Sequence, residues 1–95
     1  MQTVRLHIIG KVQGVWFRAS TKDKARSLGL TGQVWNDPDG SVRAIAQGPD
    51  EQLAELVSWC HEGPQLAMVK EVIVKEHPTE LIYPAFEITK GRSDD

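Results

Sequence analysis

The chain has 95 residues, of which 40% are hydrophobic and 25% are charged. This length supports one domain with a single core, and the composition is that of an ordinary globular protein. With 11 basic and 13 acidic residues the net charge is −2, which argues against broad, charge-driven binding of nucleic acid. No apolar run approaches the ~20 residues that span a membrane, and the opening MQTVRLHIIG is not a signal peptide.

The cysteine and histidine content argues against a disulfide and against a metal site. Cys60 is the one cysteine of the sequence, which excludes an intrachain disulfide and suits a reducing cytosol, so we expect a cytoplasmic protein. His7, His61 and His77 share no ligand spacing with Cys60. We therefore expect no metal, and we interpret each histidine as a surface or packing residue.

The first part of the chain predicts a strand followed by a helix. Residues 3–10 alternate, with Val4, Leu6 and Ile8 on one face, which is typical of a half-buried strand. The stretch from Phe17 to Gly29 repeats apolar or small residues about once per helical turn. Its closing glycine stands where a helix commonly ends.

The middle of the chain predicts a hairpin. TGQVWN (31–36) and SVRAIAQ (41–47) have the composition of strands. Asp37-Pro38-Asp39-Gly40 lies between them, and its Asp-Gly pair suits a tight turn. On the first of these strands, alternation places Val34 and Asn36 on one face and Trp35 on the other.

The last part predicts a second helix and two more strands. Gly48-Pro49-Asp50 opens the helix, with proline in its first turn, and Gly63-Pro64 ends it. One face carries the apolar spacing of a core-facing helix, at Leu53, Leu56, Val57 and Cys60. The alternating stretch 70–77 and the short stretch 85–90 predict strands, and 91–95 forms a polar tail.

This order of elements predicts an α+β fold of the ferredoxin-like plait type. Two split β-α-β halves meet in one antiparallel sheet, and both helices cover the same face. We expect a single domain over residues 1–95, ordered from about 3 to about 90, with 91–95 as a flexible tail. Because this fold carries many unrelated functions, the function must be argued from sites.

The loop GKVQGVWFR, from Gly10 to Arg18, has the features of an anion site. A helix N-terminus offers unpaired N–H groups and the positive end of a dipole, and the glycines at 10 and 14 let an anion approach the backbone. Successive amides from Gln13 to Arg18 would form a concave nest, which the guanidinium can close. A cation is otherwise disfavoured at this end of a helix, so Arg18 indicates a bound phosphate or sulfate. A simple strand-to-helix turn is the alternative reading of the glycines.

The same loop resembles the signature of the acylphosphatase family. GKVQGVWFR matches Gly-x-Val-Gln-Gly-Val-x-Phe-Arg at all seven specified positions. LGLTGQVWNDPDGSV is similar to a second family block, in which an asparagine, here Asn36, precedes an Asp-Gly hairpin. Two further segments, GPQLAMV (63–69) and FEI (86–88), resemble less specific motifs of the family. The resemblance therefore extends from Val4 to Ile88.

The resemblance implies an enzyme that hydrolyses the carboxyl–phosphate bond of acyl phosphates to carboxylate and inorganic phosphate, without a metal or cofactor. It implies two catalytic residues: Arg18 binds the phosphate and Asn36 orients the attacking water. The backbone that would cradle the phosphate belongs to Gln13, Gly14, Val15, Trp16, Phe17 and Arg18. A carboxylate leaving group, whose conjugate acid has a pKa near ~4, needs no general acid.

The implied partners are a small-molecule acyl phosphate and inorganic phosphate, the latter as product and competitive inhibitor. Nucleic acid, membrane and a second subunit are not expected, so we predict a monomer. Three tryptophans could suggest base stacking, but the alternating aromatic and basic pattern of an RNA-binding sheet is missing.

Alternative functions remain open at this point. A non-catalytic, anion-binding or regulatory module of the same fold would keep the loop but would hydrolyse no substrate. The acylphosphatase-like domain of larger carbamoyl-transfer enzymes is a second alternative, which the length of the chain disfavours. For single residues, Asn36 has a plain reading as a turn cap before Asp37, and Trp16 either shapes an acyl pocket or packs partly in the core.

Overall fold

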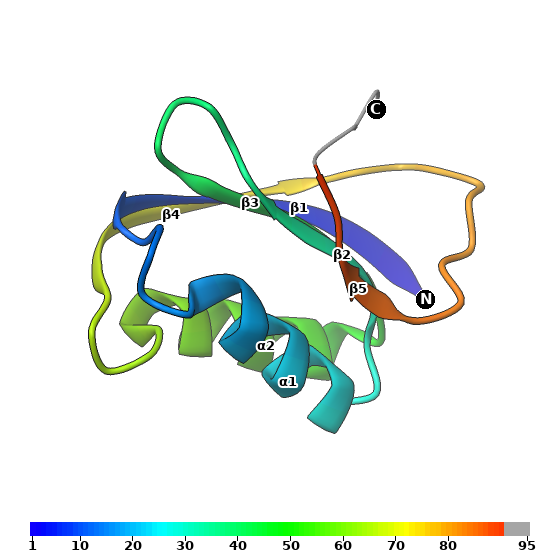
Figure 1. Ribbon diagram of the computed structural model, residues 1–95. Coiled ribbons are helices and arrows are strands. Elements are labelled where there is room, and N and C mark those ends of the chain that lie inside the picture. The colour runs from blue at the N-terminus through cyan, green and yellow to red at the C-terminus, as the bar shows by residue number, and fades with distance from the viewer. Residues whose placement is uncertain (91–95) are drawn as a thin grey trace.

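In the computed structural model, which describes residues 1–90, a five-stranded sheet is covered on one face by two helices (Figure 1). The expected tail at 91–95 lies outside the described residues. Within residues 1–90 no helix has the length and apolar character needed to cross a bilayer. The elements in chain order are β1 (Gln2–Lys11), α1 (Phe17–Ser27), β2 (Thr31–Asn36), β3 (Val42–Gly48), α2 (Asp50–Glu62), β4 (Met68–Glu76) and β5 (Phe86–Ile88).

The strand order is β4-β1-β3-β2-β5. β1 pairs antiparallel with β3 and β4, and β2 pairs antiparallel with β3, which confirms the predicted ferredoxin-like order. β5 instead pairs parallel with β2, from Gly32 to Val34, so the sheet is mixed and not wholly antiparallel. The long connection after β4 makes this possible, because it carries the chain to the opposite edge of the sheet.

Two element boundaries differ from the sequence prediction. α2 begins at Asp50, and Pro49 stands just before it with an extended ψ of 153°, not inside the first turn. β4 begins at Met68, two residues before the alternating stretch at 70, because Met68 pairs with Lys11 beyond a β-bulge in which Lys70 is the extra residue. The helix endings match the prediction: α1 ends before Gly29, whose φ is 75°.

The core lies between the sheet and the helices. The predicted inward residues of β1 are buried, as are three of the four predicted residues of α2, while Val57 is half-buried and packs against them. α1 adds the ring of Phe17, which packs on Trp59 with ring centroids 5.6 Å apart. The buried residues that these three elements contribute are Val4, Leu6, Ile8, Phe17, Thr21, Ala25, Leu53, Leu56 and Cys60.

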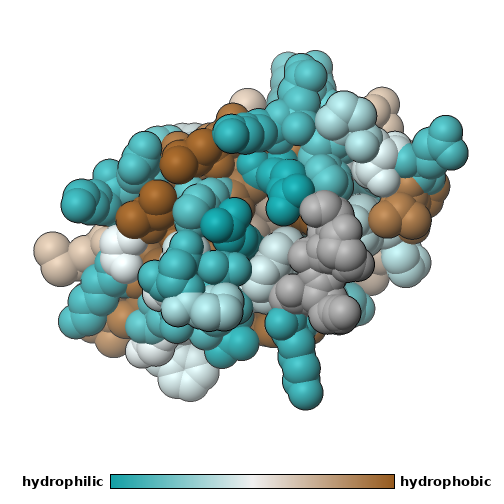
Figure 2. All heavy atoms as spheres, turned by 90° about the horizontal axis from the view of Figure 1, so that it is seen from above, coloured by the Kyte–Doolittle hydropathy of each residue, from teal (hydrophilic) through white to brown (hydrophobic). Residues whose placement is uncertain are grey.

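The outer face of the sheet is partly covered by the connection from 77 to 85. The buried side chain of Gln47 on β3 holds this segment: its Nε2 donates to the carbonyl of Leu81 at 2.9 Å, and its Oε1 accepts from the N–H of Tyr83 at 3.0 Å. Trp35 lies on this face, as alternation predicted, yet only 3% of its surface is exposed. Figure 2 looks onto the outer face, where hydrophilic side chains predominate and hydrophobic surface shows between them.

Cys60 is fully buried on α2, and burial raises the pKa of its thiol to about 12. Because the thiolate is the reactive form, we expect Cys60 not to react with a disulfide reagent such as DTNB in the native protein at pH 8. It should react fully in urea. Rapid labelling without denaturant would contradict the burial of this side chain.

Candidate active site

The loop between β1 and α1 is anchored by apolar side chains that point into the core. Val12, Val15 and Phe17 are 1%, 6% and 1% exposed, respectively. The residues between them face outward, and Trp16 is 75% exposed. These three buried side chains therefore hold the loop against the core, and the backbone of the loop remains on the surface.

The backbone of this loop is curved by two residues with positive φ. Gly14 has φ 77°, and a Cβ added there would meet nothing within 4 Å. Trp16 has φ 68° and ψ 19°, a left-handed conformation that no other non-glycine residue adopts within residues 1–90. Because Phe17 then begins a right-handed helix, successive N–H groups turn toward a common point, as in an anion nest.

The N-terminus of α1 is suited to a negative charge. The helix's first backbone hydrogen bond runs from the N–H of Ser20 to the carbonyl of Trp16 at 3.0 Å, and no side chain caps the helix. The first turn has no acidic residue and contains Arg18, whose charge opposes the helix dipole. An anion bound at this point would satisfy the N–H groups and pair with the guanidinium.

The two glycines of the loop have different roles. The sequence predicted that both let an anion approach the backbone, and this is wrong for Gly10. A Cβ at Gly10 would lie 2.3 Å from the carbonyl oxygen of Met68, so this glycine is required by the close approach of β4 at the register shift. Gly14 alone of the two faces the candidate site.

A cavity of about 450 Å³ opens beside the loop. It brings together the predicted residues Gly14, Trp16, Phe17, Arg18 and Asn36. Val12, Ala19 and Ile88 complete the lining, and sequence reasoning had given none of them a role. Gln13 and Val15 do not line it: Val15 points into the core, and the side chain of Gln13 turns toward the β2–β3 hairpin.

Asn36 carries an unusual acceptor. Its Oδ1 is buried, and no described residue donates a hydrogen bond to it. An acceptor removed from water without a partner is costly, so this atom indicates a position that a donor from solvent or substrate fills. The turn-cap alternative is not supported, because no hydrogen bond from the turn reaches this oxygen.

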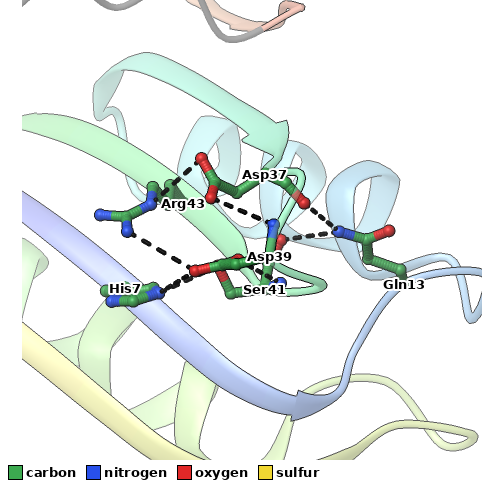
Figure 3. Close-up of polar contacts among 6 residues, drawn as sticks. All are labelled: His7, Gln13, Asp37, Asp39, Ser41 and Arg43. Carbon is green, nitrogen blue, oxygen red and sulfur yellow. Dashed lines mark hydrogen bonds and ion pairs between the residues drawn. The ribbon is translucent and has the colours of Figure 1, made fainter.

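The side chain of Gln13 joins the loop to the hairpin that carries Asn36 (Figure 3). Its Nε2 donates to the carbonyl of Asp37 at 2.8 Å and to the carbonyl of Ser41 at 2.9 Å. These two carbonyls stand on opposite sides of the turn, and the N–H of Asp37 also donates to the carbonyl of Ser41. One amide group therefore fixes the position of the loop relative to the strand end at Asn36.

The outer side of the same turn is held by charged groups. The hydroxyl of Ser41 donates to Asp39 Oδ1 at 2.5 Å, and the Ser41 N–H donates to the same oxygen at 2.8 Å. Both bonds hold the pKa of Asp39 at about 2. Arg43 contacts Asp37 and Asp39 at 3.3 and 3.7 Å, and His7 Nε2 contacts Ser41 Oγ at 2.9 Å (Figure 3).

Within residues 1–90, no group of three or more histidine, cysteine, aspartate or glutamate side chains gathers in a way that could hold a metal ion. None of the charged groups of the turn lines the cavity. The residues that line the cavity include one guanidinium, that of Arg18, and one carboxamide, that of Asn36.

A sequence model of the acylphosphatase family matches residues 4–88. The chain belongs to this family. It is 52% identical over 87 residues to the acylphosphatase of Marinobacter nauticus (strain ATCC 700491 / DSM 11845 / VT8), an alignment that covers 90% of this chain and 95% of the relative. The acylphosphatase of Thiobacillus denitrificans (strain ATCC 25259 / T1) is also 52% identical over 87 residues, which cover 92% and 96% of the two chains.

Solved structures agree with the family. An acylphosphatase from Coxiella burnetii superposes with a TM-score of 0.88 at 38% identity, over 93% of this chain and 92% of that one. Full-length HypF in its phosphate- and nucleotide-bound form gives 0.83 at 28% identity, over 93% of this chain but 12% of that one. This member of the acylphosphatase family is an acylphosphatase enzyme that hydrolyses acyl phosphates.

We expect Gln13→Glu to lower kcat for acyl phosphate hydrolysis by about 10- to 100-fold, because a carboxylate cannot donate to the two carbonyls and a small displacement of catalytic groups has effects of this size. Steady-state kinetics of the purified variant measure this. Gln33→Glu is the matched control, because it makes the same change on β2 at a half-buried side chain outside the cavity lining. Equal kcat values for the two variants would contradict the positioning role.

We expect Ser41→Ala to raise the pKa of Asp39 from about 2 toward its ordinary value of 3.8. The hydroxyl donor is lost, while the N–H of residue 41 remains. Because the folded-state pKa is depressed, Asp39 stabilises the fold above about pH 3.8, and this contribution is lost as the pH falls through about 2.

NMR titration of the Asp39 carboxyl carbon measures the shift. Ser58→Ala, on the exposed side of α2, is the control and should leave the titration unchanged. A Ser41→Ala variant in which Asp39 still titrates near pH 2 would show that other groups hold this pKa.

Proposed function

We propose that the enzyme hydrolyses acyl phosphates by in-line attack of water on phosphorus, without a metal ion. The observation that carries this proposal is the pairing of two groups in one cavity: the guanidinium of Arg18 and the buried, unsatisfied Oδ1 of Asn36. One is suited to a phosphate and the other to a water molecule.

The phosphate is bound by the loop. Backbone N–H groups from Gln13 to Arg18 donate to its oxygens, and the Arg18 guanidinium forms charge-assisted hydrogen bonds to them. Charge spreads over the equatorial oxygens in the loose transition state of phosphoryl transfer, so donors fixed around these oxygens stabilise it. The left-handed Trp16 and the helical start at Phe17, which the core anchors, support this assignment.

The attacking water is oriented by Asn36. Its Oδ1 accepts a hydrogen bond from the water, and this satisfies the buried acceptor. The water oxygen forms a bond to phosphorus as the bond from phosphorus to the acyl oxygen breaks, and the carboxylate leaves with that electron pair. A carboxamide is a poor base, so the proton of the water passes to the phosphate.

The acyl group lies against the apolar wall of the cavity. Trp16 and Ile88 are 75% and 39% exposed, and both border the cavity. The high exposure of Trp16 argues against the alternative in which this side chain packs partly in the core. It favours a role in contacting the acyl chain. Because all these residues come from one chain, the monomer is the catalytic unit, and inorganic phosphate competes for the same loop.

The test is hydrolysis of benzoyl phosphate in the presence of EDTA. We expect rapid, EDTA-resistant turnover by the wild type and loss of turnover in Asn36→Ala, with inhibition by inorganic phosphate retained. Arg18→Gln should lose about 10³-fold or more in kcat/KM and should also lose phosphate inhibition. The two variants therefore separate water positioning from phosphate binding.

Circular dichroism confirms that both variants are folded. Turnover that stops with EDTA would contradict the metal-free mechanism. Loss of phosphate inhibition in Asn36→Ala would indicate a structural role for this residue, and unchanged inhibition in Arg18→Gln would exclude Arg18 as a ligand.

A further inference from the structure

β5 is a short strand at the edge of the sheet, and one of its residues borders the active-site cavity (Figure 1). It runs from Phe86 to Ile88 and pairs with β2 over three positions. Ile88 lines the cavity together with Trp16. A strand of this length is held weakly by its own ladder, so other contacts of β5 determine how firmly Ile88 is placed.

The side of β5 that faces β2 is held by backbone hydrogen bonds. The N–H of Gly32 donates to the carbonyl of Ala85 at 3.0 Å, and the N–H of Thr89 donates to the carbonyl of Val34 at 2.9 Å. Carbonyls of successive residues in a strand point in opposite directions. The carbonyl of Phe86 therefore points away from β2, toward the edge of the sheet.

Arg26 of α1 reaches this carbonyl. Its Nε donates to the carbonyl oxygen of Phe86 at 3.1 Å, and its Nη2 donates to Glu87 Oε1 at 3.3 Å. The ion pair with Glu87 is exposed, with 49% and 59% of the two side chains accessible, so it contributes little. The bond to the carbonyl is charge-assisted and partly buried, and it ties the backbone two residues before Ile88 to the helix.

α1 therefore contributes to both ends of the substrate site. Arg18 stands in its first turn, beside the loop, and Arg26 stands in its last turn. At a rise of 1.5 Å per residue, the two positions are about 12 Å apart along the helix axis. One helix thus carries the proposed phosphate ligand near its beginning and holds the strand of the proposed acyl wall near its end.

We propose that Arg26 is a positioning residue, which holds Ile88 in place and so sets the preference of the enzyme for the size of the acyl group. This inference rests on the proposed function, in which the acyl group lies against Trp16 and Ile88. A large apolar acyl group buries surface on this wall, whereas the methyl group of an acetyl substrate offers little surface to it. Loss of the bond from Arg26 therefore weakens the binding of large acyl groups selectively.

The test compares benzoyl phosphate with acetyl phosphate. Arg26→Met keeps the length of the side chain and removes its donors. We expect it to lower the ratio of kcat/KM for benzoyl phosphate to that for acetyl phosphate by about 3- to 10-fold, through KM for benzoyl phosphate. Acetyl phosphate hydrolysis and inhibition by inorganic phosphate should stay within about 2-fold of the wild type. Arg26→Leu is a second variant with the same expectation.

Two matched controls isolate the bond to the carbonyl. Lys24→Met removes a cation from the same turn of α1, and Glu87→Gln removes only the exposed ion pair. Both should keep the ratio within about 2-fold of the wild type. A loss in either control as large as in Arg26→Met would overturn the proposal, and so would an equal loss of both substrates in a folded Arg26→Met.

Ile88→Ala separates this proposal from the proposed acyl wall. It should lower the same ratio, and adding Arg26→Met to it should lower the ratio no further, because both changes act on one contact. An unchanged ratio in Ile88→Ala would overturn the acyl wall and this inference with it. A lowered ratio in Ile88→Ala beside an unchanged ratio in Arg26→Met, or additive losses in the double variant, would overturn the role of Arg26 alone.

Discussion

The active site depends on the burial of Val12, Val15 and Phe17 beneath a loop whose other residues face solvent. Close packing leaves these side chains few alternative positions, so the backbone between them is fixed without any ligand. The left-handed conformation of Trp16 is sustained by the anchors on either side of it. Hydrogen-bond donors that are fixed before the substrate arrives need no reorganisation during the reaction, and this is the basis of electrostatic catalysis.

The second half of the site comes from a distant part of the chain and is brought into place by polar contacts. Asn36 ends β2, and the turn that follows is held on one side by Gln13 and on the other by Arg43. The Gln13 carboxamide donates to two backbone carbonyls of this turn, so it fixes the position of Asn36, which we propose binds the water, relative to the loop that we propose binds the phosphate. The apolar core thus fixes one half of the site, and a single side-chain amide links it to the other half.

The plait was predictable from the sequence, because alternation and helical spacing are local patterns, and the candidate catalytic residues Arg18 and Asn36 came from the resemblance of the loop and the hairpin to the acylphosphatase family. The role of the Gln13 side chain was not, because its acceptors lie 24 and 28 residues away and are backbone atoms that no pattern marks. Gly10 was misread for a similar reason: its neighbour is Met68, across a strand pair. Ile88 reaches the cavity through a parallel pairing that a prediction of a wholly antiparallel sheet leaves out.

That parallel pairing also joins two strands that lie far apart in the sequence. The strand that brings Ile88 to the cavity, β5, follows the other elements of residues 1–90 in the chain, and its partner β2 precedes it by more than fifty residues. Contacts of such long sequence separation form late, because the intervening chain must be closed into a loop first. A nascent chain with β1, α1 and the hairpin already folded would have the phosphate loop and Asn36 but lack one wall of the cavity. The proposed acyl-binding wall is therefore complete only when β5 has joined the edge of the sheet beside β2.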